Sequence, residues 1–216
     1  MLVTAIMPTR GRPAFAEKAL VSFLSQTWHE KELVIIDDAD DPSFDVRKWP
    51  SSIDYHRRKP RVTIGQKRNW CCELARGEVI AHWDSDDWSA PDRIRVQVEL
   101  MQESGKAVVG FHALTFFDVA RNIAVVWDST RQLRTADYAL GSSLMYRRDW
   151  WKVHRFPHDD IGEDNTFVGA AVAAGQLFAV PGGDLLIARI HAGNTSPKDT
   201  DGMQRLKEIL PPGFLP

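Results

Sequence analysis

The sequence predicts a single α/β domain in which a mixed, mostly parallel sheet is flanked by helices. Between residue 1 and about residue 111, short apolar runs alternate with segments of helical periodicity. Short apolar runs are typical of strands buried on both faces, and helices between them connect parallel strands. The composition agrees, because 44% of the 216 residues are hydrophobic and 26% are charged, as in globular domains.

The regular first half contributes the clearest elements. Strands are predicted at residues 3–7, 33–36, 79–83 and 108–111, with Pro8 ending the first of them. Helices are predicted from Pro13, at residues 66–75, and from Pro91 to about residue 104. In the first helix, an apolar stripe that should face the sheet consists of Ala16, Leu20, Phe23, Leu24 and Thr27.

The second half is less regular. The runs 115–119 and 123–127 flank a short polar segment, which indicates a hairpin. Further elements are expected at residues 141–146, 148–154, 162–174 and 185–190, the second and third of them helical. The proline-rich end is expected to be a loosely held tail. The two halves are expected to share one site.

Charge and hydropathy exclude several classes of protein. The formal net charge of −2 gives no overall attraction to nucleic acid or membranes, and no apolar run approaches the roughly 20 residues that span a bilayer. The N-terminus has the character of a buried strand and not of a signal peptide. The two cysteines, Cys71 and Cys72, are adjacent and cannot join distant segments. We therefore expect a soluble, cytoplasmic protein.

Acidic residues follow two of the predicted strands. Asp84, Asp86 and Asp87 come after the third strand, and Asp37 and Asp38 come after the second. Ligands of open α/β sheets bind beyond the carboxyl ends of the strands, so both groups belong at one edge of the sheet. Carboxylates this close repel one another unless a cation lies between them, and Mg²⁺ or Mn²⁺ prefers such oxygen ligands. The alternative is a solvated turn that caps the following helix.

Six stretches carry a resemblance to a known family. They are VTAIMPTRGRP, ALVSFLSQTWHEKELVIIDDADD, IGQKRNWCCELARGEVIAHWDSDDWSAPDRI, GSSLMYRRDWW, GEDNTF and ARIHAGNTS, in this order. With them the chain resembles the family 2 glycosyltransferases of the Rossmann-like GT-A fold over residues 1–196. The third stretch, with its DxD motif, is the most specific. The resemblance implies a nucleotide-binding half at residues 1–111, an acceptor half at residues 112–196 and a C-terminal tail at residues 197–216.

The resemblance also implies roles for individual residues. Asp164, in GEDNTF, matches the position of the family's general base, and Asp86 and His191 match its metal ligands, with Mn²⁺ or Mg²⁺ as the cofactor. Contacts to the nucleotide or the donor sugar are implied for Pro8, Arg10, Asp37, Arg68, Asp84, Asp87 and Glu163. Two neighbouring features are interpreted as solvent-exposed, namely Lys67 and the charged loop segment 158–160.

The implied reaction is the metal-dependent, inverting transfer of one sugar from a nucleotide-sugar donor, first of all a UDP-sugar, to an acceptor hydroxyl. The Q-x-x-R-W signature of processive synthases is absent, which favours a single transfer. The family often has an arginine six residues after the base, where this chain has Ala170, so the acceptor contacts stay open. A saccharide or a lipid-linked glycan is the expected acceptor.

Three alternatives remain. Basic and aromatic residues interleave in the segment 56–61 and again at Arg131, Arg134, Arg147, Arg148, Trp150 and Trp151. This pattern would suit glycosylation of modified DNA bases by a phage-type enzyme, although charge runs are usually solvated faces. The segment VIIDDADD superficially resembles a metal-dependent phosphatase, but the D-x-D that would begin at Asp38 is not followed by the glycine of that pattern. The third alternative is a non-catalytic module that binds nucleotide-sugars.

Overall fold

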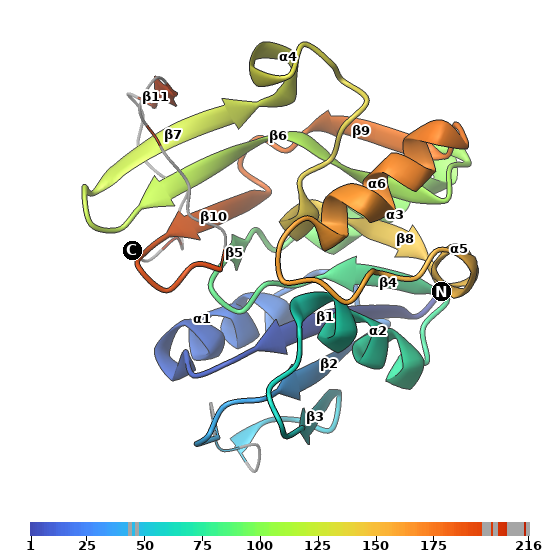
Figure 1. Ribbon diagram of the computed structural model, residues 1–216. Helices are drawn as coiled ribbons and strands as arrows, with labels where there is room; N and C mark the ends of the chain where they lie inside the picture. Colours follow the sequence, from blue (N-terminus) through green and yellow to red (C-terminus); the bar gives the residue numbers. More distant parts are fainter. Residues whose placement is uncertain (43–44, 46–47, 196–199, 201–202, 207–213, 215–216) are drawn as a thin grey trace.

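The first half of the chain builds a parallel sheet from strands that its helices connect. The computed structural model describes the chain except for residues 43–44, 46–47, 196–199, 201–202, 207–213 and 215–216 (Figure 1). The parallel strands lie in the order β3 (Ile53–Arg57), β2 (Lys31–Asp37), β1 (Val3–Thr9) and β4 (Val79–His82). The helices of this half are α1 (Pro13–Leu24), α2 (Ile64–Leu74) and α3 (Arg93–Ser104).

Beyond β4 the same sheet continues with strands of both directions. β8 (Met145–Arg147) runs antiparallel between β4 and β6 (Val108–Asp118), and β7 (Ile123–Asp128) forms a hairpin with β6. Also in the sheet are β9 (Leu177–Pro181), β10 (Leu186–Ile190), β5 (Trp88–Ser89) and β11 (Gln204–Arg205). The remaining elements are α4 (Ser129–Gln132), a 3₁₀ turn (Gly141–Ser143), α5 (Arg148–Val153) and α6 (Glu163–Ala173). The expected mixed, mainly parallel sheet is confirmed.

Alternate residues of the central strands pack against different helices. Val3, Ala5 and Met7 of β1 contact the cluster formed with α1 and α3, whereas Ile6 belongs to the cluster formed with α2, α5 and α6. Figure 1 shows α2 and α6 on the same side of the sheet. Burial on both faces explains why these strands are continuous apolar runs. Among the described residues, no helix combines the length and the apolar composition that crossing a membrane requires.

β1 is longer than expected, because it continues through Pro8 to Thr9. Pro8 stands in register with Ile36 of β2. On the other side, β4 pairs only as far as Ile6, whose carbonyl accepts the Trp83 N–H at 2.9 Å. In a strand, the backbone groups of residues two apart point toward the same neighbouring strand. An N–H at position 8 would therefore point to the β4 side, beyond the last residue of β1 that pairs with β4. The proline therefore breaks no hydrogen bond of the sheet.

The other differences between the predicted and the observed elements concern the length of β6, two half-exposed strands and the buried face of α1. Residues 108–111 and 115–119, expected as two strands, form the single strand β6, since the residues between them also pair with β7 and β9. The pattern did not reveal β3 and β9, which are half-exposed. In α1, Ala19 is buried in place of Leu24, which is 36% exposed.

The described parts of the C-terminal segment contact the domain. The expected boundary at residues 196–197 lies outside the described residues. β11 pairs with β7, and Phe214 is buried against Phe117 and Ile187. Burying an aromatic ring removes apolar area from water, so Phe214 is held by packing.

Candidate active site

The loops around the carboxyl ends of β1 and β4 surround one pocket together with the segment before α6 and the end of β10. Six carboxylates line it: Asp84, Asp86, Asp87, Asp160, Glu163 and Asp164. Of the described cationic residues, Arg12, Arg68 and Arg189 line it as well, and we term it the acidic pocket. β1 and β4 are parallel neighbours, so their carboxyl ends meet at this edge of the sheet. The position of the Asp84–Asp87 cluster agrees with the prediction from the sequence.

Of the three neighbouring aspartates Asp84, Asp86 and Asp87, Asp86 contacts the largest number of polar side chains. Its Oδ2 accepts a hydrogen bond from Arg12 Nη1, and lies 3.1 Å from His191 Nε2 and 3.4 Å from Asn194 Nδ2. The Gly193 N–H donates to His191 Nδ1 at 3.0 Å, so a neutral imidazole carries its proton on Nε2, facing Asp86. The structure therefore brings the two predicted metal ligands into direct contact.

Burial and mutual repulsion separate the pKa values of the three neighbouring aspartates. Burial by itself raises the pKa of each of them. For Asp86, the hydrogen bond to His191 and the charge of Arg12 outweigh burial, and its pKa lies below the ordinary value. Burial, followed by the charges of Asp86 and Asp84, raises the pKa of Asp87 well above the ordinary value. Burial also raises the pKa of Asp84. Asp86 is therefore the member that most readily carries the negative charge.

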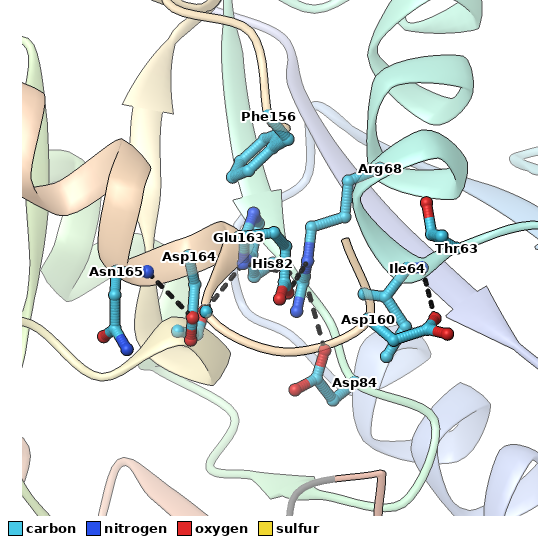
Figure 2. Close-up of polar contacts among 12 residues, drawn as sticks. Thr63, Ile64, Arg68, His82, Asp84, Phe156, Asp160, Glu163, Asp164 and Asn165 are labelled. Atoms are coloured by element: carbon cyan, nitrogen blue, oxygen red, sulfur yellow. Dashed lines mark hydrogen bonds and ion pairs between the residues drawn. The ribbon is translucent and has the colours of Figure 1, made fainter. Parts of the chain in front are cut away.

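Arg68 connects acids on two sides of the pocket. From α2, its Nε donates to Glu163 Oε1 at 3.2 Å, and its Nη1 lies 3.6 Å from Asp84 Oδ1 (Figure 2). Nη1 also lies 2.8 Å from Nδ1 of the buried His82. Burial alone would lower the pKa of Arg68, but the charges of Asp84 and Glu163 raise it above the ordinary value. A guanidinium that is fully charged thus holds the walls of the acidic pocket together.

Asp164, the predicted general base, lies in the first turn of α6, where the helix dipole favours a carboxylate. Its Oδ1 accepts the Asn165 N–H at 2.8 Å, and Figure 2 shows both side chains beside the Arg68 network. A Cβ on Gly141 would lie 1.9 Å from Asp164 Oδ2. Glycine is therefore required at position 141 for the carboxylate to occupy this place.

Tyr138 and two apolar residues, which the sequence did not single out, lie on the same side of the pocket as Asp164. Phe116, Tyr138 and Leu140 all line the acidic pocket. The Tyr138 hydroxyl donates to Asn165 Oδ1 at 3.0 Å, and burial together with the Asp164 charge raises the pKa of Tyr138 to about 12. No local pattern marks the loop before the 3₁₀ turn as a neighbour of α6, so the sequence held no signal for this wall.

A second pocket adjoins the acidic pocket at the loop after β1. Four cations line it, Arg10, Arg12, Arg61 and Lys67, and we term it the basic pocket. The residues that line both pockets are Pro8, Arg12, Ile64, Asp160 and Thr195. The predicted nucleotide-binding residues Pro8 and Arg10 therefore lie here, with Pro8 at the boundary between the pockets.

Two residues interpreted as solvent-exposed belong to the site instead, namely Lys67 and Asp160. Lys67 is 5% exposed, and its Nζ lies 2.9 Å from Asp38 Oδ1. Asp160, in the segment 158–160, accepts the Ile64 N–H at 3.0 Å (Figure 2) and lines both pockets. The interpretation of Lys67 is wrong, because its partner lies 29 residues away in the sequence and a local charge run does not reveal it. In the segment 158–160, His158 and Asp159 are exposed as expected, and Asp160 alone departs from the expectation, through a partner 96 residues away.

Asp37 stands apart from the other predicted site residues. It is fully buried, and its carboxylate accepts hydrogen bonds from the Tyr55 hydroxyl at 2.7 Å and from the Ala39 N–H at 2.9 Å. The residues that line the acidic and basic pockets do not include it. In this conformation Asp37 orders the turn after β2.

Comparison with known proteins identifies the family. The model of glycosyl transferase family 2 matches residues 4–180. The chain belongs to this family. EpsH of Bacillus subtilis, a glycosyltransferase by name, is 24% identical over 74% of this chain and 51% of its own length. An uncharacterized glycosyltransferase of Haemophilus influenzae is 25% identical over 74% of this chain and 68% of its own length. The family 2 glycosyltransferase described here thus spans about half the length of EpsH.

Solved structures share the fold of this family 2 glycosyltransferase. S. aureus TarS 1–349 in complex with UDP-GlcNAc aligns with a TM-score of 0.73 at 20% identity, over 90% of this chain and 60% of that chain. The mannosyltransferase PcManGT from Pyrobaculum calidifontis, in complex with GDP-Man and Mn²⁺, aligns with a TM-score of 0.68 at 19% identity, over 89% and 58%. The GT-A fold predicted from the sequence is confirmed.

Proposed function

We propose that this family 2 glycosyltransferase moves one sugar from a nucleotide-sugar, first of all a UDP-sugar, to an acceptor hydroxyl with inversion and without processivity. The observation that carries the proposal is the meeting of Asp164 and Asp86 at one pocket, with His191 in contact with Asp86, beside a second pocket lined with cations. The acidic pocket offers a base and ligands for a cation. The basic pocket offers partners for an anionic nucleotide.

Asp86 and His191 fit a hard divalent cation when the imidazole carries its proton on Nδ1 and so frees Nε2. The Gly193 N–H then gives up its hydrogen bond to Nδ1. The pKa of Asp86 is lowered, and the imidazole lies 3.1 Å from its carboxylate. Mg²⁺ typically uses one or two protein carboxylates and completes its shell with water and phosphate oxygens. Within the described part of the chain, no three His, Cys, Asp or Glu side chains form a group that could hold a metal. We infer that Asp86 and His191 bind Mn²⁺ or Mg²⁺ jointly with the donor's diphosphate.

Asp164 acts on the acceptor in this proposal. In inverting transfer, the acceptor hydroxyl attacks the anomeric carbon from the face opposite the leaving diphosphate, and a carboxylate within hydrogen-bond reach removes its proton. The Asn165 N–H and the close approach of Gly141 orient the Asp164 carboxylate for this step. When bound, the divalent cation would supply Lewis-acid stabilisation to the leaving group.

The remaining predicted residues keep binding roles. Arg68 and Glu163 hold the pocket wall, and Asp84 and Asp87 face the space in which the donor sugar and ribose would lie. Pro8 and Arg10 line the nucleotide end. A contact from Asp37 to the base stays part of the proposal, and it requires the turn after β2 to open.

A saccharide or lipid-linked glycan is the acceptor that we favour over DNA. The excess of carboxylates around Asp164 would repel a polyanion. Within the basic run, Lys59 pairs with Asp40 at 3.2 Å, Arg61 pairs with Asp160 at 3.4 Å, and Arg57 donates to the Asp40 carbonyl at 2.7 Å. Each of these cations has a partner within the protein, and the ion pairs of Lys59 and Arg61 are exposed to solvent.

The phosphatase alternative lacks support from the site. It would need an accessible carboxylate at Asp38, whereas the Asp38 side chain is buried and paired with Lys67. The binding-module alternative leaves the same pockets without turnover, and an experiment separates it from the proposal.

A thermal-shift panel of UDP-, GDP- and dTDP-sugars with Mn²⁺ or Mg²⁺ tests the donor. A tight ligand raises the melting temperature by mass action, so we expect one nucleotide-sugar to do so in a metal-dependent manner. Transfer to saccharide acceptors, with the anomeric configuration of the product determined by NMR, tests the reaction. A retained configuration, or no shift with any donor, would contradict the proposal. A shift without transfer would identify a binding module.

A further inference from the structure

Arg12 joins three loops of the site. It precedes α1, and its Nη1 donates to Asp86 Oδ2 while its Nη2 donates to the Gly193 carbonyl. These contacts connect the loop after β1 with the loops after β4 and β10. The Arg12 side chain is 23% exposed, so most of its surface is covered while it makes these polar contacts.

The contact of Arg12 with Asp86 uses the oxygen that faces His191. Asp86 Oδ2 lies 3.1 Å from His191 Nε2 and also accepts from Arg12 Nη1. A divalent cation bound by both Asp86 Oδ2 and His191 Nε2 would lie next to Arg12 Nη1, which donates to the same oxygen. Two cations on one carboxylate oxygen also repel each other. The guanidinium and a metal ion are therefore alternative partners of Asp86.

Among the residues that the structure describes, Arg12 is the cation that lines both pockets. A nucleotide-sugar with its nucleoside in the basic pocket and its sugar near Asp164 has to pass its diphosphate through their boundary. A guanidinium released from Asp86 would meet the diphosphate there, and its planar fork matches phosphate oxygens.

We propose that Arg12 is a diphosphate-binding residue which the metal-free protein keeps on Asp86 and which a divalent cation releases. This inference rests on the proposed function, because it concerns the same donor. It makes the bindings of metal and donor interdependent. Metal binding has to displace Arg12, and the donor regains that interaction through its phosphates.

The first test measures Mn²⁺ binding without nucleotide, by the EPR signal of free Mn²⁺, in the wild type and in Arg12→Gln. Removing the competing guanidinium should tighten Mn²⁺ binding by about tenfold. Arg10→Gln is the matched control, because it removes the same charge from the same loop without touching Asp86. We expect its Mn²⁺ affinity to stay within about twofold of the wild type.

The second test measures UDP binding by calorimetry with saturating Mn²⁺. Arg12→Gln should bind UDP about tenfold more weakly, because a charge-assisted hydrogen bond to phosphate is lost. Arg12→Lys should recover part of that loss, since it restores the charge without the fork. Tighter metal binding combined with weaker UDP binding is a result that a merely structural loop residue would not give.

Two outcomes overturn the inference in different ways. If the wild type binds Mn²⁺ and Arg12→Gln binds it no more tightly, Arg12 does not compete for Asp86 and only this inference fails. If neither protein binds Mn²⁺, the proposed metal site itself fails, and the inference fails with it. Far-UV circular dichroism of each variant shows whether it is folded before the titrations are compared.

Discussion

The acidic and basic pockets share a boundary but have opposite charge. The acidic pocket sets six carboxylates against three arginines, and the basic pocket sets four cations against Asp160. The acids come mainly from the loop after β4 and from the start of α6, whereas the cations come from the loop after β1 and from the region around the start of α2. The division arises from which loops fold together, since no single stretch of the sequence contains both sets.

The largest effect is expected in the acidic pocket from Asp164→Asn. Loss of a general base should lower kcat by about a thousandfold, while the affinity for UDP in the basic pocket stays unchanged. Turnover and UDP binding, measured on the same preparation, check this. Asp137→Asn is the matched control, because Asp137 is exposed and outside the lining of both pockets. Equal losses in the two variants would remove Asp164 from the proposed chemistry.

Gly141→Ala tests the acidic pocket a second time, through the residue that lies against the Asp164 carboxylate. The added Cβ would lie 1.9 Å from Asp164 Oδ2 and 2.9 Å from Asp164 Cβ, so the whole Asp164 side chain has to move. We expect kcat to fall about a hundredfold through misplacement of the base, with a moderate fall in the melting temperature. Gly169→Ala, at a helical glycine with open space around its Cβ position, is the control. A Gly141→Ala enzyme with wild-type kcat would contradict this role.

The basic pocket should respond to Lys67→Met with a loss of stability. The variant leaves Asp38 buried without its counter-charge, which should cost about 3 kcal/mol in the free energy of unfolding. Lys59→Met breaks the exposed pair with Asp40 and should cost less than about 1 kcal/mol. Urea denaturation of both variants makes the comparison. Similar values for the two would show that burial does not distinguish these pairs.

The smallest effect concerns pH. Burial raises the pKa of Glu163 above the ordinary value of 4.5, and the Arg68 charge only partly opposes this. As the pH rises from about 4.5 through the raised pKa, the unfolded chain releases this proton before the native protein does. The native state then binds more protons, so the contribution of Glu163 to stability falls in this window.

Glu163→Gln should therefore flatten the decline of stability with rising pH in that window. Thermal unfolding between pH 4 and pH 7 measures the slope, and Glu103→Gln, on the exposed face of α3, controls for the change in net charge. A slope identical to that of the wild type would mean that another group carries the pH dependence.

Much of the fold could be predicted because hydrophobic periodicity is local. The strands around Ala5, Ile35 and Ile80 are buried on both faces, and this leaves continuous apolar runs in the sequence. β3 was not predicted, since its residues are half-exposed and interspersed with polar ones. β9 is a short apolar run, LFAVP, which was missed although it has the composition of a strand. The pairing of β6 with several strands likewise has no signature in its own sequence.

The candidate site likewise contains residues that could be predicted from the sequence and residues that could not. The Asp84–Asp87 cluster was predictable, because it follows an apolar strand whose carboxyl end had to reach a ligand-binding edge. Its contact with His191 agrees with the expected ligand pair. The sequence around Arg12 does not indicate its contact with Asp86, because 74 residues separate the two. Asp37 follows a strand as Asp84 does, yet it is turned into the protein by Tyr55.

The sequence by itself determined the alternation of strands and helices, the edge at which the acids gather, and the family. The tertiary structure alone decided which residues meet: the charged pairs Arg12 with Asp86 and Lys67 with Asp38, and the close approach of Gly141 to Asp164. The physical reason is that burial of apolar residues follows a repeat of a few positions, whereas pairing of charges depends on distances in space. Those distances exist only after the sheet has brought its loops together.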